Sequence, residues 1–175
     1  FENFLISTHY LASEIKKFCG DGKKWGVKIT YLHERKPLGT AGCLFFLKKK
    51  IKNSILVNNG DVLTSLDYQE MLKSHNLNGW DITIAVQKNN TRIPFSVVKT
   101  KGLQIKNILE KPLFTNYINA GIYVISPNIL RLLEKKRKID MPNLIQQAIS
   151  KKKKVYAFPL HEDWGDFGQN INQIS

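Results

Sequence analysis

Ser54-Ile55-Leu56-Val57-Asn58-Asn59-Gly60-Asp61 joins a short apolar run to a polar end. The apolar half predicts a buried strand, and this strand runs out at a glycine and a carboxylate. In an open sheet of parallel strands, ligands bind outside the carboxyl ends of the strands. Gly60 and Asp61 are therefore candidates for a binding site at that edge of the sheet.

A second carboxylate on a glycine turn lies far along the chain, in Trp164-Gly165-Asp166-Phe167-Gly168. Two such acids, remote in sequence, indicate a shared divalent metal, and a metal beside bare peptide suits phosphate chemistry. We therefore expect Asp61 and Asp166 to converge on one divalent metal ion. Trp164 is a candidate ligand platform, with packing in the core or at its rim as the alternative.

The first half of the chain alternates strands with helices. Apolar runs and helical spacing predict strands over residues 4–8, 27–32, 54–57 and 81–86, and helices over residues 10–18, 40–47 and 68–75. Thr40 is the expected N-cap of the second helix. This alternation is typical of an α/β fold, in which a mostly parallel sheet carries helices on both faces.

The pattern changes in the second half. The runs over residues 95–99 and 105–109 flank a turn at Lys101-Gly102 and predict a β-hairpin. A strongly apolar strand is expected over residues 117–125, helices over 127–134 and 141–149, and a last strand over 155–158. No linker or shift in composition marks a boundary, so one domain over residues 1–175 is expected.

Composition indicates a globular chain, with 42% hydrophobic and 10% aromatic residues among 175. No apolar run approaches membrane-spanning length, and the first residues do not resemble a signal peptide. We therefore expect a cytoplasmic protein with no membrane partner. Cys19 and Cys43 fit neither a metal-ligand spacing nor a disulfide framework, and we expect them to be reduced thiols.

The net charge of +13 indicates an anionic partner, either a small substrate or a nucleic acid. The positive charge gathers in three runs near the ends of predicted helices, where cations oppose the negative end of the helix dipole. These runs are Lys48–Lys50, Lys135–Lys138 and Lys151–Lys154. No aromatic-rich strand accompanies them, which favours solvated helix ends over nucleic-acid binding.

Three weaker motifs accompany the two acids. Pro37-Leu38-Gly39-Thr40-Ala41-Gly42 leads into a helix, where glycines and free N–H groups let a flat ligand approach the backbone. Glu110-Lys111-Pro112 is either an exposed ion-pair turn or a site where the carboxylate accepts sugar hydroxyls and the cation meets a phosphate. In Asn119-Ala120-Gly121, Asn119 either satisfies the backbone of a bulge or donates to a ligand.

Together and in this order, these segments resemble the sugar-1-phosphate nucleotidyltransferases, in the branch of the mannose-1-phosphate guanylyltransferases and glucose-1-phosphate thymidylyltransferases. The resemblance also includes Gly20-Asp21-Gly22, Trp25-Gly26-Val27 and Asp140-Met141-Pro142, and it covers nearly the whole chain. It implies a Rossmann-like, glycosyltransferase-A-like fold in which the hairpin forms a small sugar-binding subregion. The implied reaction transfers a nucleotidyl group from a nucleoside triphosphate to a sugar 1-phosphate.

The resemblance also implies roles for individual residues. Asp61, Asp166 and Lys111 would be catalytic, with the two acids as Mg²⁺ ligands and the lysine on the sugar phosphate. The substrate-binding set would be Gly39, Thr40, Gly42, Gly60, Glu110, Asn119, Gly121 and Trp164. Within this set, Gly39 and Gly42 would lie near the base and ribose. Glu110, Asn119 and Gly121 would lie near the sugar.

The sequence departs from the family at two places. The family's opening glycine-rich loop, with its arginine and lysine, is missing from these residues. We therefore expect an N-terminally truncated domain without the first βα unit, weakly active or inactive by itself. Ser96 stands near the expected sugar, where the family often has glycine. The alternative function is a non-catalytic module that binds nucleotide or sugar phosphate, and a homo-oligomer stays open.

Overall fold

The computed structural model describes residues 1–47, 51–133 and 137–170. The chain forms two compact units, and each is built from two separate stretches of sequence. The first unit comprises Phe1–Ile55 and Ile125–Lys154, and the second comprises Leu56–Val124 and Val155–Ser175.

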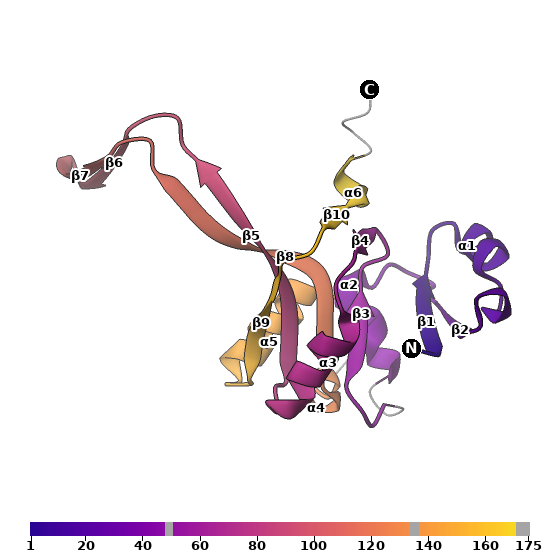
Figure 1. The fold of residues 1–175 in the computed structure, drawn as a ribbon. Coiled ribbons are helices and arrows are strands. Elements are labelled where there is room, and N and C mark those ends of the chain that lie inside the picture. The colour runs from indigo at the N-terminus through magenta and orange to yellow at the C-terminus, as the bar shows by residue number, and fades with distance from the viewer. Residues whose placement is uncertain (48–50, 134–136, 171–175) are drawn as a thin grey trace. The chain divides into compact units, whose positions relative to one another are not determined.

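A parallel strand pair begins the first unit. In β1 (Asn3–Thr8) and β2 (Lys28–His33), Asn3 lies opposite Lys28 and Thr8 opposite His33. α1 (Ala12–Cys19) and the short η1 (Lys23–Trp25) connect the two strands (Figure 1). Parallel neighbours need such a crossover connection, so this strand–helix–strand order confirms the predicted elements at the start of the chain.

Short helices follow β2 in the described part of the first unit. They are α2 (Gly39–Gly42), η2 (Cys43–Leu47), α4 (Pro127–Leu130) and α5 (Met141–Ser150). α5 packs on α2, and α4 packs on η2. The buried apolar side chains of these elements and their flanks are Leu38, Ala41, Leu44, Ile129, Leu130, Leu133, Ile139, Met141, Leu144 and Ala148.

The predicted helix over residues 40–47 is wrong in two respects. It is a single α-helical turn followed by a 3-10 helix, and its N-cap is Leu38 rather than Thr40. Thr40 lies inside α2, where its hydroxyl accepts a hydrogen bond from the Met141 N–H at 2.8 Å. A partner 101 positions away has taken the place of the local cap, and no local pattern carries that information.

A four-stranded sheet organises the second unit, in the order β3 (Ile55–Asn58), β8 (Leu113–Ile125), β5 (Ile82–Arg92) and β9 (Val155–Leu160). β5 and β9 run parallel. α3 (Tyr68–Leu77) packs against β5, and Asp67 caps it by accepting the N–H groups of Gln69 and Glu70. The buried core cluster of this unit is Leu66, Met71, Ala85, Ala120, Ile122, Val124 and Leu160.

β5 and β8 extend beyond the buried part of the sheet and carry a hairpin at their far ends (Figure 1). The Thr115 hydroxyl donates to Asn90 Oδ1 at 2.8 Å, and the Ile93 N–H donates to the Pro112 carbonyl at 3.1 Å. The hairpin consists of the antiparallel strands β6 (Val97–Lys101) and β7 (Gln104–Leu109), which confirms the prediction around Gly102. The exposed outer part of β5, residues 88–92, was missed because it is polar, and residues 113–116 of β8 were missed because Leu-Phe-Thr-Asn is too short to show a period.

Two short strands complete the second unit. β4 (Val62–Thr64) and β10 (Trp164–Asp166) pair antiparallel, and α6 (Phe167–Asn170) follows. The Thr64 hydroxyl also donates to the Asp163 carbonyl at 2.8 Å, across 99 positions. Three residues are too few to establish a period, so the sequence did not predict these strands.

Of the lysine runs, Lys48–Lys50 and Lys135–Lys136 lie outside the described residues. The helix predicted over residues 127–134 ends at Leu130, and residue 134 also lies outside the described residues. Lys151 is the C-cap residue of α5, which agrees with the prediction of cations at helix ends. Among the helices that the structure describes, none is long and apolar enough to cross a membrane.

His75 in α3 is a buried titratable side chain, with 1% of its surface exposed. Its Nδ1 lies 2.7 Å from the Thr83 hydroxyl in β5. Burial lowers the pKa of His75, because the imidazolium would lose its hydration there, and Asp81 opposes this effect only in part.

We predict that acidification destabilises the second unit through His75. Its pKa lies lower in the folded chain than in the unfolded chain, so the unfolded chain binds the proton first. The free energy of unfolding therefore falls as the pH drops below about 6.5. Urea unfolding at pH 7.5 and 5.0 measures this, with His75→Asn expected to flatten the dependence and the exposed His161→Asn expected to leave it intact. An unchanged pH dependence in His75→Asn contradicts the prediction.

Candidate functional site

The pairing of β4 with β10 brings the two predicted acids of the second unit together. Asp61 stands directly before β4, and Asp166 ends β10 opposite Val62. The Phe167 N–H donates to the Asp61 carbonyl at 2.9 Å, which ties the end of β10 to the turn before β4. The backbone thus makes two residues that are remote in sequence into neighbours.

Gly168 lies between the two carboxylates. Its N–H donates to Asp166 Oδ1 at 2.9 Å. A Cβ built on Gly168 would overlap Asp61 Oδ2 and lie 3.2 Å from Asp166 Oδ1. Both oxygens are therefore within 3.2 Å of one point beside a glycine, and a side chain at this position would push them apart.

The donor set of this acidic pair fits a magnesium ion. Mg²⁺ is usually bound by one or two carboxylates, and it keeps water or substrate phosphate oxygens as its other ligands. Asp61 is exposed and Asp166 is half-buried, so both can reach such a shared ion. In the described part of the chain, no cluster of three or more His, Cys, Asp or Glu side chains that could hold a metal occurs, so the pair does not resemble a closed structural site.

A glycine in the left-handed conformation anchors the neighbouring part of β8. Gly121 has a φ of 76°, and its carbonyl accepts the Asn59 N–H at 2.9 Å. Asn119 accepts the Gly121 N–H through Oδ1 at 3.0 Å and donates through Nδ2 to the Tyr123 hydroxyl at 2.8 Å. Burial raises the pKa of Tyr123, which keeps its hydroxyl protonated. Both ends of the Asn119 amide thus bond within β8, which favours the first of the two alternatives, a local backbone role, over donation to a ligand.

Trp164 and Gly60 lie close in sequence to Asp166 and Asp61, and their surroundings differ. The Trp164 indole N–H donates to the Ala120 carbonyl at 2.8 Å, and its ring packs against the core cluster of the second unit. This geometry favours the packing alternative over a ligand platform. Gly60 is exposed, and a Cβ built there would meet nothing within 4 Å.

Glu110 and Lys111 follow β7 at the base of the hairpin, and both are exposed. The Ser96 hydroxyl donates to Glu110 Oε2, linking the residue before β6 to the residue after β7. Lys111 has a φ of 42°, in the left-handed region that residues with a Cβ rarely adopt. The sequence had marked Ser96 only as a departure, and the structure identifies it as the partner that orients the Glu110 carboxylate.

The glycines of the motif at residues 37–42 belong to the first unit. Gly39 has a φ of 77°, and a Cβ there would lie 2.7 Å from the Ile139 carbonyl oxygen. A Cβ on Gly42 would lie 2.6 Å from Leu38 Cβ and 3.0 Å from the Arg137 carbonyl oxygen. Both positions therefore require glycine because the loop packs on residues 137–140, a reason that differs from the ligand approach inferred from the sequence.

Hydrogen bonds fix the same loop to the segment before α5. The Ile139 N–H donates to the Leu38 carbonyl at 2.8 Å, and the Ala41 N–H donates to the Ile139 carbonyl at 3.0 Å. The Thr40 N–H donates to Asp140 Oδ1 at 3.2 Å. The predicted nucleotide loop is thus backed along its length by a segment about 100 positions later.

Glu34 holds the other side of the loop and was missed by the sequence reasoning. It is 8% exposed, and its carboxylate accepts the Leu38 N–H at 2.8 Å and the Ser7 hydroxyl at 2.5 Å. Glu34 directly follows β2, just as Asp61 soon follows β3. A polar residue at the end of a predicted strand was therefore the signal that could have found it.

The family model described as Nucleotidyl transferase matches residues 1–172. The chain belongs to this family. Its fold, with acids at turns beyond the strand ends, agrees with that assignment.

Two curated relatives are mannose-1-phosphate guanyltransferases. The chain is 31% identical over 173 residues to mannose-1-phosphate guanyltransferase beta-A of Xenopus laevis, covering 94% of this chain and 48% of that protein. It is 34% identical over 161 residues to mannose-1-phosphate guanyltransferase of Pichia angusta, covering 87% of this chain and 44% of that protein. The chain spans about half the length of the curated relatives it matches.

Solved structures share the fold at lower identity. HddC from Yersinia pseudotuberculosis complexed with GMP-PN matches with a TM-score of 0.69 at 22% identity, covering 94% of this chain and 72% of that one. The inositol-1-phosphate CTP transferase from T. maritima matches with a TM-score of 0.65 at 20% identity, covering 94% and 69%. These likenesses confirm the predicted α/β class.

We predict that Gly121→Ala lowers the free energy of unfolding by about 1–2 kcal/mol, the usual cost of a left-handed residue with a Cβ. The added Cβ would also lie 2.8 Å from Asn59 Nδ2. Gly60→Ala is the matched control, since its Cβ meets open space, and should stay within about 0.5 kcal/mol of the parent. Urea unfolding of both variants measures the difference, and equal stabilities would be incompatible with this account of β8.

Proposed function

We propose that the protein transfers a nucleotidyl group from a nucleoside triphosphate to a sugar 1-phosphate, giving a nucleoside-diphosphate sugar and pyrophosphate. The family assignment and the names of the two guanyltransferase relatives support this reaction. The observation that carries it is the convergence of Asp61 and Asp166 on Gly168.

In this reaction a sugar-phosphate oxygen forms a bond to the α-phosphorus, and the bond from that phosphorus to the pyrophosphate oxygen breaks. The nucleophile is already an anion, so the reaction needs no strong base. The obstacle is the repulsion between two phosphates, and fixed positive charge lowers it. Mg²⁺ held by Asp61 and Asp166 would neutralise phosphate charge and orient the reacting groups.

Other residues of the chain would bind the two substrates. Lys111 offers an exposed ammonium group for the sugar phosphate, on a turn whose backbone is fixed. Glu110 offers a carboxylate for sugar hydroxyls, and Ser96 orients it. The loop with Gly39 and Gly42 offers a backbone already held by hydrogen bonds, so little entropy is lost when a base and ribose lie against it.

We predict that Asp61→Asn and Asp166→Asn each lower kcat/KM at least about 100-fold, because each removes one charged ligand of the magnesium ion. Asp67→Asn is the control: it is the same substitution, at a helix N-cap where asparagine serves as well as aspartate. Pyrophosphate release is measured with GTP, dTTP, UTP and CTP against mannose 1-phosphate and glucose 1-phosphate. The assay uses residues 1–175 and the protein as its gene encodes it.

Turnover that survives both substitutions at the level of Asp67→Asn would refute the proposed metal site. Saturable, Mg²⁺-dependent nucleotide binding without pyrophosphate release in either form of the protein would instead favour the non-catalytic binding module.

We predict that Glu110→Gln raises KM for the sugar 1-phosphate at least about 10-fold, since it removes a charged acceptor, and leaves KM for the nucleotide unchanged. Ser96→Ala should raise the same KM by a smaller factor, because the carboxylate remains but loses its orienting partner. Ser65→Ala, at an exposed serine of the same unit, is the control. A rise in the KM for the nucleotide instead would contradict the proposed contact between Glu110 and the sugar.

A further inference from the structure

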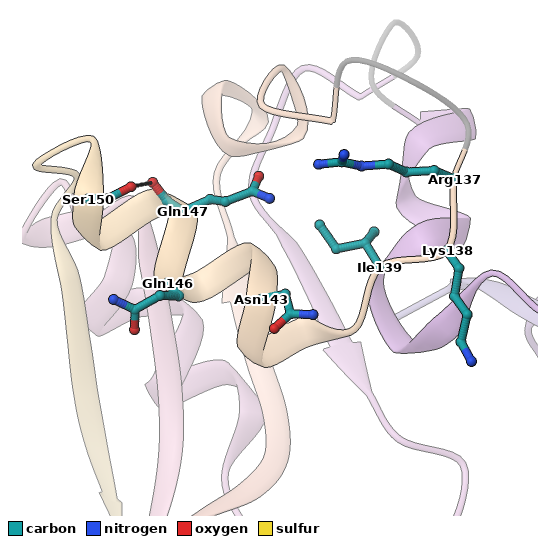
Figure 2. A pocket seen from close by; sticks show the side chains of 7 residues that line it. All are labelled: Arg137, Lys138, Ile139, Asn143, Gln146, Gln147 and Ser150. Carbon is teal, nitrogen blue, oxygen red and sulfur yellow. Dashed lines mark hydrogen bonds between the residues drawn. The ribbon is translucent and has the colours of Figure 1, made fainter.

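A groove of about 400 Å³ opens along α5 in the first unit. Its lining comes from the segment before α5 and from one face of that helix: Arg137, Lys138, Ile139, Asn143, Gln146, Gln147 and Ser150. Figure 2 shows the Arg137 side chain and the Gln147 amide extending toward one another, with Ile139 and Asn143 beside the space between them. The volume lies within the range of small-molecule sites.

The chemistry of the lining selects an anion. The lining residues that the structure describes contain two cations, three amides and a hydroxyl, and no acid. Asp140, the next residue after Ile139, directs its carboxylate to the Thr40 N–H instead. Within the described residues, neither Arg137 nor Lys138 has an ion-pair partner. Among residues 1–47, 51–133 and 137–170, no acid therefore pairs with the positive charge of the groove.

The donors fit an oxyanion better than a simple halide, and their number suits the three free oxygens of a phosphate monoester. A guanidinium presents a planar fork of N–H groups that pairs with two phosphate oxygens, and amide NH₂ groups add further donors. An inorganic phosphate alone would leave most of a 400 Å³ groove empty. Ile139, only 7% exposed, supplies an apolar contact for an organic group.

We propose that this groove is a binding site for a phosphate monoester of a small organic group, separate from the acidic pair of the second unit. Arg137 binds the phosphate, and Gln147 and Asn143 bind the ester's polar groups. A nucleoside monophosphate and a sugar phosphate share this chemistry.

The site is connected to the nucleotide loop through one residue. Ile139 lines the groove, and its backbone N–H and carbonyl bond Leu38 and Ala41. Gly42 also packs against the Arg137 carbonyl. An ester bound to Arg137 and Ile139 braces the segment that backs the loop, so occupancy of the groove changes how firmly the loop is held.

Isothermal titration of the protein as its gene encodes it, without Mg²⁺, tests the site with GMP, glucose 6-phosphate and inorganic phosphate. We expect saturable binding of at least one ester, at least 10-fold tighter than inorganic phosphate. The GMP and glucose 6-phosphate arms distinguish a nucleoside from a sugar source. Arg137→Gln should weaken this binding at least 10-fold, and Arg131→Gln, an exposed arginine outside the groove, should change it less than 2-fold.

A second variant separates this site from the proposed catalytic site. The double substitution Asp61→Asn with Glu110→Gln should leave ester binding within 2-fold of the parent. In hydrogen exchange, a saturating ester should slow the amides of Ala41 and Ile139 several-fold in the parent and not in Arg137→Gln. No ester binding, binding that is insensitive to Arg137→Gln, binding lost in the double variant, or equally tight binding of inorganic phosphate would each overturn the proposal.

Discussion

The backbone pairing of β4 with β10 is the constraint on which the candidate chemistry depends. Two carboxylates repel one another, and a short ladder with the Phe167 bond to Asp61 holds them at one place in spite of this. Gly168 supplies the room in which their oxygens face a shared point. The Mg²⁺ ion that we propose at that point would neutralise the negative charge of the two carboxylates.

Much of the architecture follows from local pattern. Alternating apolar runs predicted the parallel pairing of β1 with β2 and the strand β9, and Gly102 marked the β6–β7 hairpin. The glycine turns around Asp61 and Asp166 pointed to the pair that the structure places side by side. These features can be predicted because each depends on a hydrophobic period or on a residue type with a narrow conformational role.

The features that the sequence concealed all depend on partners far along the chain. The sequence predicts Thr40 as an N-cap, but in the structure its hydroxyl accepts a hydrogen bond from the Met141 N–H. The sequence suggests that Gly39 leaves room for a ligand, but residues 139 and 140 occupy the space where its Cβ would stand. β4 and β10 are each too short to form a pattern alone and exist only as a pair. Propensity describes neighbours in sequence, and these contacts are decided by tertiary packing.

The interleaved connectivity has a consequence for biosynthesis. The loop around Thr40 and its backing segment are 100 positions apart, so the ribosome releases the loop long before its partner exists. At about 5–20 residues per second, this gap lasts roughly 5–20 s, and the nascent loop lacks its backing segment throughout that time. Slow codons between the two segments would lengthen this exposure, and a circular permutant that joins them early in translation would shorten it.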